Sequence, residues 1–377
     1  MSKFQLSLVI VSLIMLACQS TTPTAPQQYS QTEENIDSLK YDQEVHLKNV
    51  RQLTFGGDNA EAYWSFDGQS LVFQRKHEPS GIMCDQIFIG EIPAADEAFD
   101  FKMVSTGKGR TTCSYYLHGD TNFIYASTHL SMDDCPPVPD RSKGYVWPLY
   151  PEFEIFIADE DGAITEQLTD NDFYDAEATT SPTENKIVYT STKSGDIELY
   201  VLDLDTREEL QITDELGYDG GAFFSPDGTK LVWRSSRPDT EADIAHYKEL
   251  LANDLVEPSD MELYISNIDG SNKVKVSDLG GANWAPFFHP SGEKIIFSSN
   301  HTTKMFPFNL FMVKLDGSDL EQITFDNTFD SSGNDTEYMK GLEIIFQSND
   351  KNTNDFGRLN EDDTAIGIDV DMSALTT

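Results

Sequence analysis

The sequence predicts an all-β fold, a six-bladed β-propeller built from four-stranded antiparallel blades. Three observations predict it. A turn motif of the form Ser-Pro-Asp-Gly recurs along the chain, a β-rich strand follows each copy, and further short strands with Asp-Gly turns follow in the same order. Four short antiparallel strands per unit, repeated along the chain, are typical of a propeller.

The turn motif has four clear copies and two degenerate ones. The clear copies begin at Ser65, Ser181, Ser225 and His289, and the degenerate copies lie at 116–119 and 339–341. The strands that follow them are expected at 71–73, 123–125, 187–189, 231–233, 295–297 and 344–346. Asp-Gly pairs at 161–162, 269–270 and 316–317 then supply the positive-φ residue that hairpin turns need. We therefore count six blades.

The strand order predicts how the ring closes. Third strands are expected at 86–92, 153–159, 197–203, 261–267, 308–314 and 364–371, and fourth strands of the first five blades at 102–105, 167–169, 210–213, 274–277 and 322–324. The fourth strand of the last blade comes from the N-terminal side, at 50–54. Pairing of this strand with the C-terminal ones would close the ring and leave no exposed sheet edge.

The first eighteen residues indicate export. Lys3 precedes an apolar stretch, 6–16, that is too short to span a bilayer. Residues 15–18 (MLAC) resemble a bacterial lipobox, which implies a lipoprotein signal peptide over 1–18 and a lipid on Cys18; an ordinary cleaved signal peptide is the alternative. Gln19 resembles the outer-membrane-sorted class. We expect a lipid-anchored protein of the outer membrane that faces the periplasm.

The rest of the chain divides into a disordered tether at 19–44, rich in Pro, Thr and Gln, the propeller at 45–371, and a tail at 372–377. The chain carries 26 Lys and Arg against 65 Asp and Glu, a net charge of −39. This charge argues against a nucleic-acid partner and limits membrane contact to the lipid anchor. Either a solvated acidic surface or a cationic partner accounts for the charge.

Residues 51–54 (RQLT), 62–68 (AYWSFDG) and 220–228 (GGAFFSPDG) resemble the TolB-like propeller repeat, a WD-like unit shared by the Tol–Pal protein TolB and by tricorn and dipeptidyl-peptidase-IV propellers. The resemblance covers 46 to about 371. It implies the fold and says little about function, because this repeat serves many roles. The α/β domain that precedes the propeller in TolB and a peptidase domain are both missing, so neither a Tol–Pal role nor proteolysis is implied.

The candidate site lies at the mouth of the central channel, where each innermost strand begins. Positions six residues before the turn motif are polar in five blades, and those four residues before it include two glutamates. The candidate ligand-binding residues are Asn59, Glu61, Asp175, Glu177, Asp219, Asn283 and Trp284. Such residues either bond backbone groups and pin adjacent blades, or line a mouth for an amine, a basic peptide segment or a divalent cation, of which calcium is the more natural metal.

Two insertions and the cysteines are expected on the same face. Residues 237–260, with Thr240 as a helix N-cap, form either a lid or a helix packed on the rim, and residues 131–151 form an aromatic, Pro-rich loop that contacts a ligand or covers a blade edge. Cys84, Cys113 and Cys135 predict one disulfide and one unpaired thiol. His129 and His301 are weak candidates for metal ligands; the histidines show no metal-binding spacing.

These features favour a cell-envelope lipoprotein that acts as a non-catalytic binding scaffold. Its partner would be an envelope protein or peptide, or a glycan, and no catalytic residue is assigned. The alternative is a propeller enzyme, either a hydrolase or a metal-dependent polysaccharide lyase such as oligogalacturonate lyase. The sequence has no G-x-S-x-G elbow, phosphate-binding loop or dinucleotide fingerprint.

Overall fold

The computed structural model describes residues 41–46, 51–94, 97–140, 142, 144–258, 260–304 and 308–325, together with the backbone of 340–347 and 364–371. The expected signal peptide, Cys18 as the expected lipid acceptor, most of the expected tether and the tail lie outside the described residues. In the part of the chain that is described, no helix is both long and apolar enough to cross a membrane.

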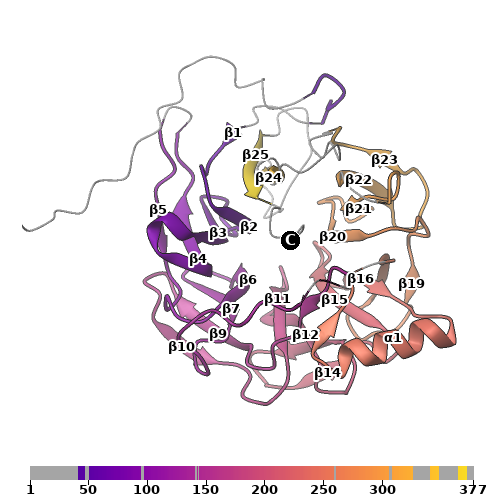
Figure 1. The fold of residues 1–377 in the computed structure, drawn as a ribbon. Helices are drawn as coiled ribbons and strands as arrows, with labels where there is room; N and C mark the ends of the chain where they lie inside the picture. Colours follow the sequence, from indigo (N-terminus) through magenta and orange to yellow (C-terminus); the bar gives the residue numbers. More distant parts are fainter. Residues whose placement is uncertain are drawn as a thin grey trace, which may run out of the picture.

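Five four-stranded antiparallel sheets follow one another around a central axis (Figure 1). In each sheet the strands run in chain order from the axis outward. The first two sheets consist of β2 (Asp58–Trp64), β3 (Ser70–His77), β4 (Ile82–Glu91) and β5 (Phe101–Met103), and of β6 (Thr111–Tyr116), β7 (Asn122–Ser127), β9 (Glu154–Asp159) and β10 (Ile164–Gln167). A short 3-10 helix, Glu78–Ser80, separates β3 from β4.

The other three sheets have the same order. They consist of β11 (Asp175–Thr180), β12 (Lys186–Ser191), β13 (Glu198–Asp203) and β14 (Glu209–Gln211); of β15 (Tyr218–Phe224), β16 (Lys230–Ser236), β18 (Glu262–Asn267) and β19 (Val274–Lys275); and of β20 (Asn283–Phe288), β21 (Lys294–Ser299), β22 (Asn309–Lys314) and β23 (Glu321–Gln322). Five of the blades predicted from the turn motifs are therefore four-stranded sheets in the structure.

The prediction of six four-stranded blades closed by the N-terminal strand is wrong. Among the described residues β24 (Lys340–Gln347) and β25 (Thr364–Asp371) form an antiparallel pair, and β1 (Arg51–Gln52) joins β25 to make a three-stranded sheet. Because β1 is only two residues long and runs parallel to β25, it is not the antiparallel outer strand that closure requires. The described chain contains five blades and no closed ring.

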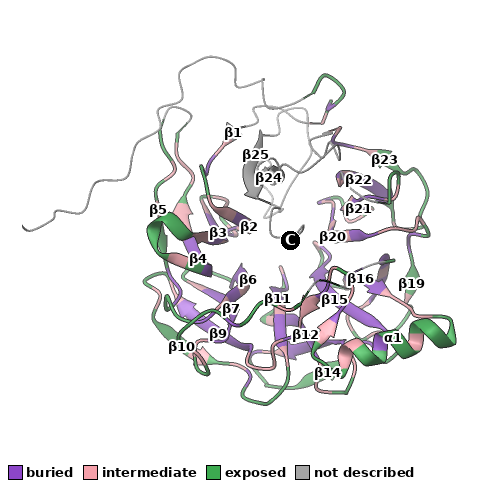
Figure 2. Ribbon diagram, in the orientation of Figure 1, coloured by how far each residue is buried: buried purple, intermediate pink, exposed green. Residues whose placement is uncertain are grey.

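The core lies between neighbouring blades, where apolar side chains of the strands pack face to face. Figure 2 shows that buried residues concentrate in the strands and that exposed ones lie in the connecting loops and on one side of α1. The rings of Tyr115, Tyr63, Phe223 and Phe287, which come from four blades, contact one another in that order with tilted or edge-on geometry and centroid distances of 4.9 to 5.7 Å. This aromatic layer joins the innermost strands on the side of the turn motifs.

The two insertions meet each other across the third blade. Residues 237–260 form α1 (Glu241–Leu251), which Thr240 caps as predicted, and β17 (Leu255–Val256). The loop between β7 and β9 carries β8 (Trp147–Pro148), which pairs with β17 in a two-stranded ribbon. We call the loop at 128–153 the strap. Tyr247 of α1 donates to Asp196 on the third blade over 2.5 Å, so the helix packs on the rim.

Candidate functional site at the channel

Each innermost strand carries a β-bulge at the same place, and the bulge forms the site. The pairing with the second strand shifts register there in all five described blades. One residue of each bulge adopts a left-handed backbone with φ between 43° and 59°: Glu61, Cys113, Glu177, Gly221 and Ala285. A non-glycine residue rarely adopts this conformation. The bulges thus bring Glu61, Cys113 and Glu177 of three blades together near the axis.

Glu177 is the best-connected side chain of the cluster. It forms an ion pair with Arg234 of the fourth blade, and both side chains are mostly buried, with 13% and 12% exposed. Its carboxylate also accepts from the Thr190 hydroxyl at 2.8 Å and from the backbone N–H of Gly221 at 3.0 Å. Tyr218 donates to it at 3.2 Å. These donors satisfy the Glu177 carboxylate within the protein.

Arg234 connects this cluster to the strap. Its guanidinium lies 5.4 Å from the ring of Trp147 and 5.6 Å from that of Tyr218, and it donates to the Tyr218 hydroxyl at 2.8 Å. Cation–π contacts of this kind stabilise a desolvated cation. A side chain at Gly221 would collide with the Arg234 guanidinium. Glycine at this bulge position therefore leaves the space that the guanidinium occupies. The strap therefore contributes Trp147 to the channel site.

Glu61 and Cys113 form the second half of the cluster. Both are half-buried, and the Cys113 thiol hydrogen-bonds to Glu61. Burial, and after it the charge of Glu177, raises the pKa of Glu61. Burial and the nearby carboxylates also raise the pKa of Cys113 well above its usual value, so the thiol is neutral near pH 7. A neutral thiol is a poor nucleophile.

Four of the predicted site residues do not face the channel. Asn59, Asp175, Asp219 and Asn283 are fully buried and lie opposite residues near the ends of their second strands. Asp219 accepts from Trp233 at 2.7 Å and from Arg237 at 2.7 and 2.8 Å, and Asn283 accepts from Ser299 at 2.6 Å. Their role is to pin strands within and between blades.

Trp284, the last of the predicted site residues, lies beside the strap. Its ring centroid is 5.1 Å from that of Trp147 and 5.1 Å from that of Phe308. Its indole nitrogen is buried and has no hydrogen-bond partner among the described residues. Glu61, Glu177 and Trp284 are thus the members of the predicted set that the fold places at the channel.

His129 and His301 occupy equivalent positions in the second and fifth blades and do not meet. The Nδ1 atom of each imidazole shares a hydrogen bond with the hydroxyl of the serine two residues earlier, with Ser127 at 3.0 Å and with Ser299 at 2.9 Å. Each ring also packs on an aromatic ring of its own third strand at 4.5 Å. Burial lowers the pKa of both histidines. They act as packing residues of the repeat.

No group of three or more His, Cys, Asp or Glu side chains is arranged to hold a metal ion within the described ranges. Asp175 and Asp219, two of the four carboxylates from which calcium was expected, are fully buried inside the blades. The channel retains Glu61 and Glu177, and Glu177 is already paired with Arg234. The described site thus offers too few free oxygens for a calcium ion, which takes six to eight.

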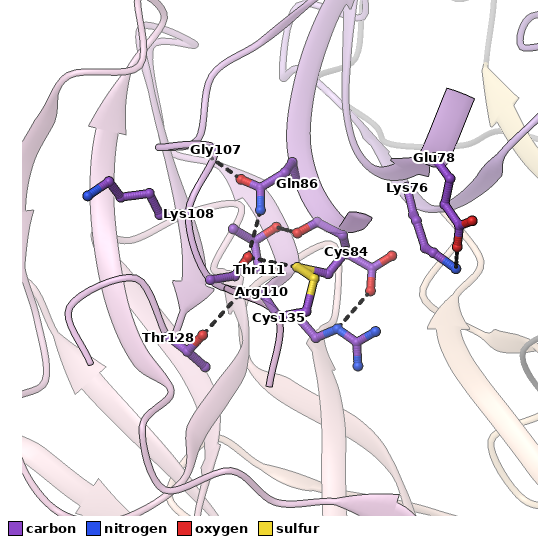
Figure 3. Close-up of a disulfide and its surroundings, with 12 residues drawn as sticks. Lys76, Glu78, Cys84, Gln86, Gly107, Lys108, Arg110, Thr111, Thr128 and Cys135 are labelled. Carbon is purple, nitrogen blue, oxygen red and sulfur yellow. Dashed lines mark hydrogen bonds and ion pairs between the residues drawn. A yellow bond between two sulfur atoms is a disulfide. The ribbon is translucent and has the colours of Figure 1, made fainter. Parts of the chain in front are cut away.

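A disulfide joins Cys84 of β4 to Cys135 of the strap, with the Cα atoms 5.8 Å apart, and Cys113 is free (Figure 3). Nearby, Gln86 donates to the Gly109 carbonyl at 2.9 Å and accepts from Gly107 at 3.0 Å. The strap residue Asp133 pairs with Lys108 at 2.7 Å. The strap is thus tied to the first blade at one end and to the fourth, through the β8–β17 ribbon, at the other.

Sequence reasoning missed Arg234, Tyr218 and Tyr174 as members of the cluster. The sequence contained a signal for Arg234, because this charged residue follows directly on the apolar run 231–233 of the second strand. Gly221, at a position where the four other described blades carry a larger side chain, was a second signal that space is needed there. Tyr174 precedes the innermost strand of the third blade, and nothing in its spacing marked it.

No protein-family model and no curated protein sequence matches the chain. Among solved structures, a protein described as TolB from Agrobacterium tumefaciens is similar, with 17% identity, a TM-score of 0.50, and coverage of 72% of this chain and 84% of that one. TolB from Acinetobacter baumannii is similar with 14% identity, a TM-score of 0.51 and coverage of 72%, and this chain spans 55% of it. A TolB-like propeller fold is therefore established for this chain.

Proposed function

We propose that this protein is an exported, lipid-anchored propeller that binds an envelope protein or ligand at the strap face of its channel and does not catalyse a reaction. The observation that carries the proposal is the convergence of Glu61, Cys113, Glu177 and Arg234 from four blades beneath the tethered strap. Rigid scaffolds that present such clusters between loops are typical binding sites.

Two features favour binding over catalysis. The one thiol in the cluster is neutral, and the one arginine is held by Glu177, so the described cluster holds neither an activated nucleophile nor a free electrophile. The strap also exposes large apolar side chains to solvent, Leu130 by 60% and Val138 by 71%. Exposed apolar side chains beside a polar pocket are suited to contact with a protein partner.

The binding part of the proposal is tested by photo-crosslinking in cells. A photoreactive phenylalanine analogue at Val138 is expected to capture a discrete envelope partner, because this side chain extends from the strap. The matched control places the same analogue at Val274, which is 48% exposed on the outer strand β19. Equal labelling from both positions, or none from Val138, would contradict a partner site at the strap.

The anchoring part rests on Cys18. Cys18→Ser removes the acceptor for the lipid and is expected to move the protein from the membrane fraction to the soluble periplasmic fraction, because one or two acyl chains supply the membrane affinity. Fractionation with immunoblotting measures this change. A Cys18→Ser protein that stays in the membrane fraction at its wild-type size would show that lipid on this residue is not the anchor.

A further inference from the structure

The channel cluster carries one negative charge that the described protein does not balance. Glu61 and Glu177 face one cation, Arg234, and Arg234 is shared between Glu177 and the Tyr218 hydroxyl. Asp85, the other acid whose charge acts on Glu61, pairs with Arg110 at 3.2 Å. Cys113 and Tyr174 are neutral, since burial raises both pKa values well above their usual range. Burial also raises the pKa of Glu61, which favours its neutral form; when Glu61 is ionised, its charge has no counter-ion of its own among the described residues.

Hydrogen bonding leads to the same residue. The Oε2 atom of Glu61 is buried and has no hydrogen-bond partner among the described residues, whereas the Glu177 carboxylate accepts from four groups. An unsatisfied carboxylate oxygen in a buried site costs about 1–3 kcal/mol or more, so native proteins rarely keep one without a reason. The same cluster holds the unpartnered indole N–H of Trp284. Glu61 thus has both a carboxylate oxygen that can accept a further hydrogen bond and a charge that a cation could balance.

The backbone of Glu61 adopts a conformation of raised energy in the bulge. Its φ of 51° is a conformation that a glutamate rarely adopts, and the bulge that imposes it is repeated in every described blade. The walls beside the cluster are aromatic: Trp147 and Tyr218 already hold one cation, the guanidinium of Arg234, against their rings. A second organic cation at the cluster would meet the Glu61 carboxylate, on a face whose rings already hold a guanidinium.

We propose that Glu61 binds the cationic head of an organic amine or guanidine, a single positive charge carried by the proposed partner or ligand. This inference rests on the proposed function and names the chemistry of its site. A monovalent head balances the one unpaired charge, and its N–H groups supply the donor that Oε2 lacks. The described cluster lacks the oxygen ligands of a divalent metal site. The ligand would enter from the strap side, where the cluster lies next to Trp147.

Cys113 reports directly on this site. In the full chain with Cys18→Ser, Cys84 and Cys135 are bonded to each other and Cys113 is the remaining thiol. Methyl methanethiosulfonate, a neutral reagent, transfers its methylthio group to this sulfur as methanesulfinate leaves and the thiol proton goes to solvent. The rate of this reaction is measured with n-butylammonium chloride and with sodium butyrate at equal ionic strength. Butylammonium is expected to slow the reaction saturably, by about threefold or more, and butyrate is not.

The control variants separate Glu61 from general electrostatics. Glu61→Gln keeps the shape and should lose the protection, while Glu160→Gln removes an equal charge from an exposed position and should keep it. Should Glu61→Gln melt well below the parent protein, Glu61→Asn replaces it, because asparagine tolerates a left-handed backbone. Equal protection by butyrate, or protection that survives loss of Glu61, overturns the inference. If a partner is captured at Val138 but butylammonium does not protect the Cys113 thiol, the inference about the ligand class is wrong and the proposed function still stands.

Discussion

Reduction of the Cys84–Cys135 disulfide is expected to lower the free energy of unfolding by about 4 kcal/mol, the estimate for releasing a loop of this size in the unfolded chain. The two cysteines are separated by 51 residues, and the loop they close contains β4 to β7, the outer half of the first blade and the inner half of the second, with the first part of the strap. Because Cys135 is exposed, a mild reductant reaches the bond. Urea unfolding of the oxidised and reduced protein, followed by tryptophan fluorescence, measures the difference.

The double variant Cys84→Ser with Cys135→Ser should reproduce the effect of reduction. The matched control is Cys113→Ser, which removes the thiol that forms no disulfide and should leave the response to reductant unchanged. The β8–β17 ribbon would still hold the far end of the strap in the reduced protein, so Trp147 should remain over Arg234. Reduction without any loss of stability would show that the strap is held by its other contacts alone.

The blade repeat was readable from the sequence because it depends on local chemistry. Turn motifs such as 225–228 are fixed by short-range bonds: Ser225 donates to Asp227 at 2.6 Å and accepts from the Lys230 N–H at 2.9 Å. A motif of this kind places a hairpin wherever it occurs. The last sheet was mispredicted because its pairing joins residues some 300 positions apart in the sequence. The amino acids of 50–54 indicate a strand but do not determine whether it pairs with the C-terminal strand in parallel or antiparallel orientation.

The candidate site was predicted in part for a similar reason. Counting back from the turn motif identified two rows of residues, but alternation along a strand does not show that a bulge follows the first row. The bulge separates the two rows: Asp175 and Asp219 are fully buried in their blades, whereas Glu61 and Glu177 are half-buried and act on each other electrostatically. Arg234 enters from the neighbouring strand, and this contact depends on packing between blades, which no local pattern encodes.

Glu198 should make the protein lose stability as the pH rises. It starts the third strand of the third blade, is 2% exposed, and its Oε2 atom has no hydrogen-bond partner in the described structure. Burial, with smaller contributions from Asp219 and Asp196, raises its pKa to about 8, while Thr213 and Arg237 act the other way. An acid whose folded pKa lies above its unfolded value of 4.5 binds more protons when folded, so its contribution is present at low pH and is lost between pH 4.5 and about 8.

The expected size of this loss is at most about 5 kcal/mol, since the pKa rises from 4.5 to about 8 and each pKa unit corresponds to about 1.4 kcal/mol. Glu198→Gln, which stays neutral, should match the wild type near pH 5 and be the more stable protein near pH 9. The matched control is Glu262→Gln, at the same position of the next blade, where the carboxylate accepts from Ser277, from the Gly280 N–H at 2.7 Å and from Asn283 at 3.1 Å. That change removes a satisfied acceptor and should destabilise the protein. Urea unfolding across this pH range measures both, and a Glu198→Gln protein whose stability falls with pH as steeply as the wild type would place the titrating group elsewhere.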